Sequence, residues 1–159
     1  MVIEDNCVLD AKGSSNKGIS IGRRSNCNPR NVVLSCKNGD IAVGSNTVIG
    51  INSLIHAVEG SNVSVGQDVL HICLCIHNRR RQLSLGKPDL PIRKQGLVSK
   101  GGIDIGSNVW LGASVNVTDG VTIAEGNIIG AYSLVNKSIE TRDYISFGVP
   151  AKPHKSRIQ

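Results

Sequence analysis

Aromatic residues are scarce in this chain, and the marks of several common protein classes are missing with them. Phe, Trp and Tyr together make up 3% of the 159 residues, which suits narrow, stacked β-coils better than a core of large side chains. No apolar run reaches the roughly 18 residues of a membrane-spanning helix. Met1 is not followed by the charged and then apolar segments of a secretory leader. We therefore expect a cytoplasmic protein without a membrane span.

The cysteines lack the pattern of a disulfide framework or a zinc site. There are five of them, an odd number, and no two form a CxxC pair. Reduced, small and mostly buried thiols are the ordinary form of such residues inside a cell. We predict neither a disulfide framework nor a metal site among Cys7, Cys27, Cys36, Cys73 and Cys75.

Charge is balanced over most of the chain, but one segment is strongly basic. The net charge is +6, and residues 78–100 account for the excess because they contain a single acid, Asp89. The cations of this segment are Arg79, Arg80, Arg81, Lys87, Arg93, Lys94 and Lys100. The segment has no interleaved aromatics and no recognisable nucleic-acid-binding module, so we predict no nucleic acid partner. A solvated basic loop without a role remains an alternative.

The chain does contain a regular repeat in its last third. An aliphatic residue returns every six positions, and glycine directly follows it at three of these places. The aliphatic positions are Ile105, Leu111, Val117, Ile123, Ile129 and Val135. Six is neither the helical period of 3.6 nor the strand period of two. A six-residue period is typical of a parallel β-helix.

The same period extends loosely toward the N-terminus. Three triplets, each with steps of six, begin 22 residues apart: Ile21, Cys27 and Val33; Val43, Ile49 and Ile55; Val65, His71 and His77. We interpret each as a three-sided coil of 18 residues with a corner insertion of about four, near residues 36–40 and 58–62. Residues four positions after each anchor are mostly small or aliphatic, which fits a narrow interior.

These observations predict one all-β domain over residues 1–159. Coils occupy about residues 3–77 and 103–138. Residues 78–102 interrupt the repeat and form one long extruded loop. A connection of this length in a compact domain is usually functional or disordered. Residues 139–159, with two prolines, break the period and form a short C-terminal cap on the stack.

The last third also resembles a known family. Residues 105–113 (IGSNVWLGA), 120–123 (GVTI), 135–137 (VNK) and 148–152 (GVPAK) are similar to the hexapeptide-repeat acetyltransferases, in particular the branch of maltose, galactoside and surface-polysaccharide O-acetyltransferases. The resemblance implies a left-handed parallel β-helix, acetyl-CoA as acetyl donor and a homotrimer with active sites between subunits. It further implies that the loop reaches over the next subunit and walls the active site.

The resemblance also implies a catalytic histidine near the start of the loop. Transfer of an acetyl group to a sugar hydroxyl needs a general base, and histidine suits this role. The corresponding string here is Ile76-His77-Asn78-Arg79, so His77 is our candidate base. His71 is the alternative, although a buried histidine bonded to a neighbour is its more ordinary role.

Cofactor and acceptor residues are implied in the same way. By resemblance, Ala113 and Ala131 line the pantetheine arm with their backbone groups, Trp110 walls the site, and Lys137 and Lys152 approach the phosphates. An anchor at a subunit interface is a second role for Trp110. The acceptor-binding candidates are Asn28, Asn31 and Asn78, but asparagine is also common at tight corners.

We therefore expect an acetyl-CoA-dependent O-acetyltransferase that modifies a saccharide hydroxyl through a ternary complex. An amino-sugar N-acetyltransferase is a close alternative, and a non-catalytic homologue is another. A carbonic-anhydrase-like metal protein is a further alternative, since the same β-helix carries such enzymes. His71 and His77 lie six residues apart and hence on successive faces of a coil, which is poor geometry for a shared metal.

Overall fold

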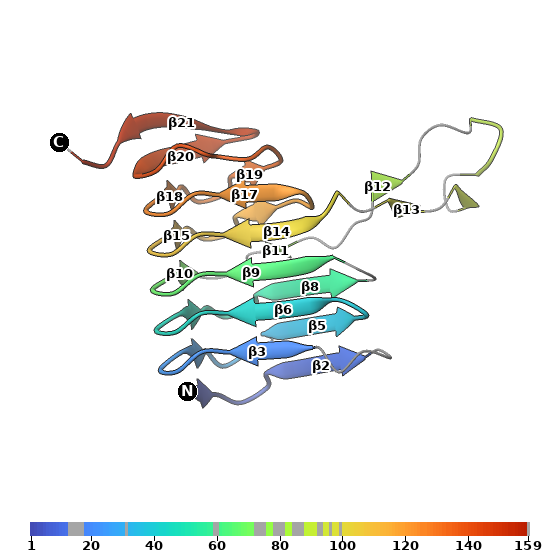
Figure 1. Cartoon of the computed structure of the whole chain (residues 1–159), viewed down its shortest axis with the longest axis horizontal. Coiled ribbons are helices and arrows are strands. Elements are labelled where there is room, and N and C mark those ends of the chain that lie inside the picture. The colour runs from blue at the N-terminus through green and yellow to red at the C-terminus, as the bar shows by residue number, and fades with distance from the viewer. Residues whose placement is uncertain are drawn as a thin grey trace.

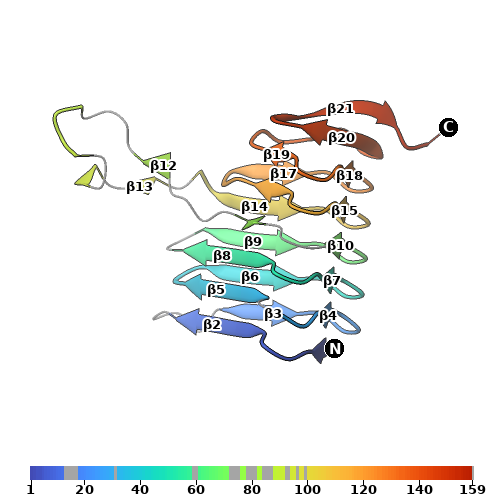
Figure 2. The same cartoon turned by 180° about the vertical axis from the view of Figure 1, so that it is seen from behind.

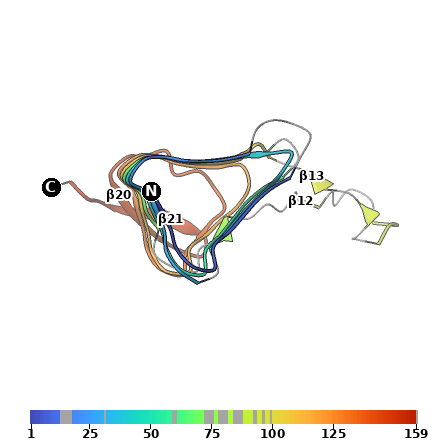
Figure 3. The same cartoon turned by 90° about the horizontal axis from the view of Figure 1, so that it is seen from below.

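The chain folds into a parallel β-solenoid of three sheets. The structure, a computed structural model, describes residues 1–12, 18–30, 32–58, 61–71, 76–77, 82–83, 88–91, 94–95, 97–98 and 100–158. Seen along the stack, the coils superpose as a triangle (Figure 3). The N-terminus and the C-terminal hairpin lie at opposite ends of the stack (Figures 1 and 2). The predicted all-β solenoid is confirmed.

Each side of the triangle is one sheet. Sheet A contains, in hydrogen-bonded order, β1 (Val2–Ile3), β4 (Asn26–Cys27), β7 (Val48–Ile49), β10 (Leu70–His71), β15 (Trp110–Leu111), β18 (Ile128–Ile129), β20 (Tyr144–Gly148) and β21 (Ala151–Ser156). Sheet B contains β2 (Val8–Lys12), β5 (Val33–Lys37), β8 (Leu54–Val58), β11 (Ile76–His77), β16 (Asn116–Val117) and β19 (Leu134–Val135). Sheet C contains β3 (Ile19–Ile21), β6 (Asp40–Val43), β9 (Asn62–Val65), β14 (Gly102–Ile105) and β17 (Val121–Ile123).

The six-residue period places one aliphatic residue of each side in the interior. The six anchors of the last third are each at most 1% exposed: Ile105, Leu111, Val117, Ile123, Ile129 and Val135. Anchors of successive coils pair in register, as Leu111 does with Ile129. Stacking therefore gives each of these six anchors an inward neighbour on an adjoining coil, and burial of this column stabilises the solenoid.

Tight corners join the sheets, and each is built around a residue with positive φ. At the corner between sheets A and B, hereafter the AB corner, these residues are Asn6, Arg30, Asn52, Ser114 and Tyr132. At the corner between sheets C and A they include Arg24, Asn46, Asp68, Asn108 and Asp143. Asparagine and aspartate tolerate this left-handed conformation better than most residues, which explains their frequency along the chain.

One anchor of the first full coil was predicted wrongly. Val33 is half-buried, whereas Leu34 is fully buried and pairs with Ile55. The step from Cys27 to Leu34 is seven residues, because the AB corner of this coil holds one residue more than in the next coil. A shift of one residue exchanges the two faces of a strand. The first 22-residue coil therefore has one extra residue at this corner and three between sheets B and C.

The excursion stands away from the stack, whereas the C-terminal cap continues sheet A before it folds back. Strands β12 (Gln82–Leu83) and β13 (Leu97–Val98) pair antiparallel and stand away from the solenoid (Figure 1). At the C-terminal end, β20 adds to sheet A beside β18, and β21 folds back on β20 as an antiparallel partner. In the part of the chain that the structure describes, no helix is long and apolar enough to cross a membrane.

Candidate active site

The residues predicted for cofactor binding gather mainly along the outer side of sheet A and the AB corner. Trp110 lies in β15 and is 43% exposed. Its register neighbours on the outer side are Leu70, which is 45% exposed, and Ile128, which is half-buried. Trp110 is thus part of an apolar ladder that faces away from the core.

Ala113 and Ala131 lie on successive coils at the AB corner. The Tyr132 N–H donates to the Ala113 carbonyl over 2.8 Å, which ties the two coils together. A Cβ on Gly112 would come within 2.7 Å of the Ala131 nitrogen, so the backbones are in close contact there. Ala131 is exposed, and no described residue hydrogen-bonds to its backbone. This corner therefore presents the backbone polar groups of Ala131 next to one large aromatic side chain, Tyr132, which is 75% exposed.

Lys152 lies in β21 at the end of the same sheet. It is exposed and pairs in register with Phe147 of β20. Lys155 follows on the same strand, while the Arg157 guanidinium donates to the Gly126 carbonyl over 2.6 Å. The two lysines of β21 are thus the cations that the hairpin offers to a ligand on this side.

Lys137 and the backbone of His77 lie on sheet B, toward different edges. Lys137 is exposed and comes two residues after β19 ends. The backbone of His77 ends β11 and pairs in register with Ile55 and Val117, both of which are buried. Because Ile55 is the second of the five residues of β8, the His77 backbone lies toward the AB-corner end of sheet B, whereas Lys137 lies beyond the end of β19, toward sheet C.

His71, the alternative base, lies inside the solenoid. It is 2% exposed and takes the interior register position of Ile49 and Leu111. Its Nδ1 lies 3.2 Å from the buried Ser53 Oγ. Such a hydrogen bond satisfies a polar ring in an apolar core, which is the structural role that sequence reasoning gave as the ordinary one.

The acceptor candidates are only partly described. Asn28 follows β4 and is half-buried. Its Oδ1 accepts a hydrogen bond from the Asn26 Nδ2 over 3.1 Å. Asn31 and Asn78 lie outside the described residues. Asn52, by contrast, takes a corner position with φ of 54°.

The extruded loop returns to the solenoid at a defined contact. The Asp119 carboxylate accepts the Lys100 N–H over 2.5 Å with one oxygen and the Gly102 N–H over 2.8 Å with the other. Gly102 has φ of 102°, and a Cβ there would collide with the Asn62 carbonyl. Sequence reasoning missed Asp119, because nothing in the repeat distinguishes an acid that binds backbone N–H groups from a solvated one.

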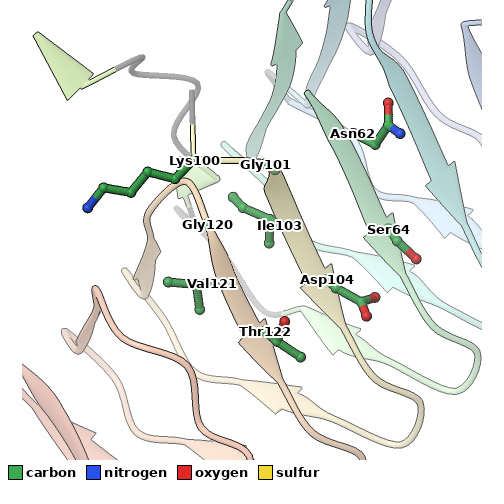
Figure 4. Close-up of a pocket in the computed structure, with 10 residues that line it drawn as sticks. Asn62, Ser64, Lys100, Gly101, Ile103, Asp104, Gly120, Val121 and Thr122 are labelled. Atoms are coloured by element: carbon green, nitrogen blue, oxygen red, sulfur yellow. The ribbon is translucent and has the colours of Figure 1, made fainter. Parts of the chain in front are cut away.

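An open cleft of about 280 Å³ lies on sheet C beside this return. Its polar lining comes from Asn62, Ser64, Asp104 and Thr122, carried by neighbouring strands, while the Lys100 side chain extends away from Asp104 (Figure 4). None of the residues predicted for catalysis or cofactor binding lines this cleft.

The cysteines that the structure describes are free thiols. Cys27 and Cys36 are buried and Cys7 is half-buried, while Cys73 and Cys75 lie outside the described residues. Burial raises the pKa of Cys27 to about 11, so this thiol is neutral at pH 7. Among the described residues, no group of three or more His, Cys, Asp or Glu is arranged to hold a metal ion.

A second aromatic feature escaped sequence reasoning. The rings of Phe147 and His154 stack with centroids 3.6 Å apart and planes 4° apart. His154 is exposed. The stacking depends on the hairpin of β20 and β21, which brings together two residues that are seven apart in the sequence.

Comparison with known sequences agrees with the repeat. Residues 102–137 match the family described as bacterial transferase hexapeptide (six repeats). The chain is 30% identical over 145 residues to a probable acetyltransferase of Mycobacterium tuberculosis, covering 87% of this chain and 44% of that relative. It is 32% identical over 110 residues to Escherichia coli WbbJ, provisionally named a lipopolysaccharide biosynthesis O-acetyl transferase, covering 65% of this chain and 55% of the relative. The chain spans about half the length of these relatives.

Solved structures agree with the fold. A mutant of the N-acyltransferase AntD from Bacillus cereus, in complex with dTDP-4-amino-4,6-dideoxyglucose and coenzyme A, superposes with a TM-score of 0.71 at 21% identity, covering 99% of this chain and 83% of that chain. PerB from Caulobacter crescentus gives a TM-score of 0.53 at 16% identity, covering 95% and 57%. The chain is a hexapeptide-repeat β-solenoid, and its resemblance to the acetyltransferases of this class is confirmed.

Proposed function

We propose that this protein is an acetyl-CoA-dependent acetyltransferase that modifies a saccharide hydroxyl. The observation that carries the proposal is the AB corner, where the exposed Ala131 backbone lies on the coil above Ala113. A long amide-bearing arm needs unpaired backbone groups such as those of Ala131 along its path. Trp110 supplies an apolar wall, and Lys152 a cation for phosphate at one end.

In the proposed reaction, His77 is the general base. The acceptor hydroxyl gives its proton to the His77 imidazole as its oxygen attacks the thioester carbonyl. A tetrahedral oxyanion forms and is stabilised by a backbone N–H donor, for which Ala113 and Ala131 are the candidates. The carbon–sulfur bond then breaks, and the imidazolium returns the proton to the thiolate leaving group. The products are the acetyl ester and coenzyme A, without a covalent enzyme intermediate.

The proposed assembly is a homotrimer with each active site between two copies. Its first support is the resemblance to the hexapeptide-repeat acetyltransferases, which implies active sites between subunits. Its second support is the largely apolar outer ladder of sheet A, together with apolar residues on sheet B that lie beside polar ones such as Asn116 and Ser35. The members of these outer ladders include Val48, Leu70, Trp110 and Ile128 on sheet A, and Val33, Leu54 and Leu134 on sheet B.

Sugar acceptors are supported by the relatives, through the name of WbbJ. Asn28, Asn31 and Asn78 are the proposed acceptor contacts, because asparagine offers both a donor and an acceptor to a sugar hydroxyl. The complex of AntD with an amino sugar makes transfer to an amine the second candidate. Mass spectrometry of the product after hydroxide treatment distinguishes the two, because mild hydroxide cleaves an acetyl ester and leaves an amide intact.

The test begins with calorimetric titration of coenzyme A into the wild type and a His77→Ala variant. We expect similar micromolar affinities, because the base does not hold the cofactor. Thiol release from acetyl-CoA is then screened over saccharides, and the variant should lose about 10²- to 10⁴-fold in kcat. His56→Ala is the matched control, since His56 is half-buried one coil away and should leave kcat unchanged.

Two results would contradict the proposal. Absence of coenzyme A binding to the wild type would contradict the proposed acetyltransferase function. Unchanged thiol release by His77→Ala would remove His77 from the chemistry, and His71→Asn would then be measured in its place. Thiol release on amino sugars alone would assign N-acetyl transfer.

A further inference from the structure

The Phe147–His154 stack forms a flat aromatic surface at the C-terminal end of the solenoid. The two rings are nearly parallel, with planes 4° apart and centroids 3.6 Å apart. Phe147 is 46% exposed and His154 is also exposed, so the pair is not part of the core. Two aromatic rings packed in this way hold each other in place and leave a rigid face available to a third ring.

The stack continues the AB corner toward the end of the molecule. Gly130 precedes Ala131 at this corner, and its N–H donates to the Ser146 carbonyl over 2.8 Å. A Cβ on Gly130 would lie 2.9 Å from the Phe147 Cβ, so Phe147 sits directly against this corner. The order along the solenoid axis is therefore Ala113, Ala131 and then Phe147.

Positive charge lies on the same side of the hairpin. Lys152 is directly opposite Phe147 in the antiparallel pair, and Lys155 is opposite Ile145. Directly opposite residues of an antiparallel pair share a face, and Phe147 and Ile145 alternate on β20. A register shift directly after Ile145 leaves His154 as an extra residue of β21, so Lys155 still lies opposite Ile145. Neither lysine forms an ion pair with any residue in the described ranges. Aromatic surface and free cations on one face are the chemistry that binds a nucleobase and its phosphates.

We propose that the Phe147–His154 stack is the platform on which the adenine ring of coenzyme A rests, with Lys152 and Lys155 meeting its phosphates. This inference rests on the proposed function, because the arm that leads to the platform is the pantetheine at Ala113 and Ala131. A nucleotide-activated sugar offers the same base-and-phosphate chemistry. The coenzyme is favoured because the platform lies at the end of the AB corner rather than beside the predicted base.

The experiment compares coenzyme A with 4′-phosphopantetheine, which lacks the adenosine part, by calorimetric titration. The proteins are the wild type, Phe147→Ala, Phe147→Tyr and the control Ile158→Ala, which removes an apolar side chain that is 64% exposed. We expect Phe147→Ala to weaken coenzyme A binding about ten-fold, in line with the usual contribution of base stacking. Binding of 4′-phosphopantetheine should stay unchanged. Phe147→Tyr should restore the affinity, and Ile158→Ala should match the wild type.

The outcomes separate the platform from the proposed function. If the wild type binds coenzyme A and Phe147→Ala binds it equally well, the platform is refuted while the acetyltransferase proposal stands. If the wild type binds neither ligand, the proposed function fails and the platform with it. A titration with dTDP completes the set: loss of dTDP binding in Phe147→Ala without loss of coenzyme A binding would assign the platform to the sugar nucleotide and overturn our inference. Circular dichroism of Phe147→Ala establishes that the solenoid is intact.

Discussion

Sheets A and C of the solenoid have similar inward side chains, but their outward side chains differ in polarity. Their inward ladders are both buried and mostly aliphatic, as Leu111 in sheet A and Ile123 in sheet C illustrate. The outward ladder of sheet A is largely apolar, and includes Val48, Leu70, Trp110, Ile128 and Ile145. That of sheet C is mostly polar, with Ser20, Ala42, Ser64, Asp104 and Thr122. The inner ladders build the fold, whereas the outer ladder of sheet A offers an apolar surface to the proposed trimer.

The strongest test of this contrast is to place one charge on each outer face. Leu70→Asp puts a carboxylate in the exposed apolar ladder of sheet A, and we expect the proposed trimer to dissociate because a charge would have to be buried at the interface. Ser64→Asp makes a comparable change on sheet C and should leave the assembly unchanged. Multi-angle light scattering after size-exclusion chromatography measures both masses. A Leu70→Asp variant with the wild-type mass would break the contrast between the faces.

Removal of an inward side chain should cost the same on either sheet. Leu111→Ala and Ile123→Ala each delete a fully buried side chain, and each should lower the free energy of unfolding by about 2–5 kcal/mol. Thr122→Ala, beside Ile123 but outward, should change it by less than about 0.5 kcal/mol. Urea denaturation followed by circular dichroism gives these values. A clear difference between the two core variants would show that the inner ladders are not equivalent.

The stability of the corner that joins sheet C to sheet A should depend on the side-chain amide of one buried residue, Asn127. Asn127 is fully buried, donates to the Ala124 and Thr141 carbonyls over 2.8 Å each and accepts the Tyr144 N–H over 3.2 Å. Asn127→Ala leaves these backbone groups without partners and should cost about 1–3 kcal/mol. Asn116→Ala is the control, because among the described residues the Asn116 side chain makes a single hydrogen bond, to Ser114. Equal stabilities of the two variants in thermal denaturation would argue against this role.

The smallest expected effect concerns coenzyme A affinity, which should depend on the outer face of sheet A but not on that of sheet C. Trp110→Ala removes the apolar wall beside the AB corner and should weaken coenzyme A binding about ten-fold, or about 1.4 kcal/mol. Thr122→Ala on sheet C should leave the affinity unchanged. Calorimetry gives both dissociation constants, and light scattering reports whether Trp110→Ala also changes the assembly. Wild-type affinity together with a smaller mass would assign Trp110 to the interface alone.

Much of the fold could be predicted because the repeat is local and regular. The six-residue period identified every anchor from Ile105 to Val135, since each coil there has the same length. The prediction failed at Val33, where one additional corner residue moved the buried position to Leu34. Periodicity cannot detect such an insertion, because both residues are aliphatic and either would fit the interior.

The site was less accessible to sequence reasoning. Motif resemblance indicated Ala113, Ala131 and Trp110, and the structure brings these to one side of the molecule. It did not indicate that Lys137 lies at the far edge of sheet B, nor that Phe147 and His154 stack. These relations depend on how sheets and hairpins fold in space. The assignments of His77 and the asparagines remain predictions.

By itself the sequence determined the class of fold, because an aliphatic residue at every sixth position can be buried only by coils stacked in register. It also determined where the repeat is interrupted, through the long basic excursion and the prolines of the tail. The tertiary structure alone decided which outward ladders are apolar and which backbone groups Asp119 and Asn127 hold. It also decided that an aromatic pair lies at the end of the AB corner. These features bring together residues of different coils or opposite strands, whose distances are fixed by the stacking and folding of the chain rather than by their separation along it.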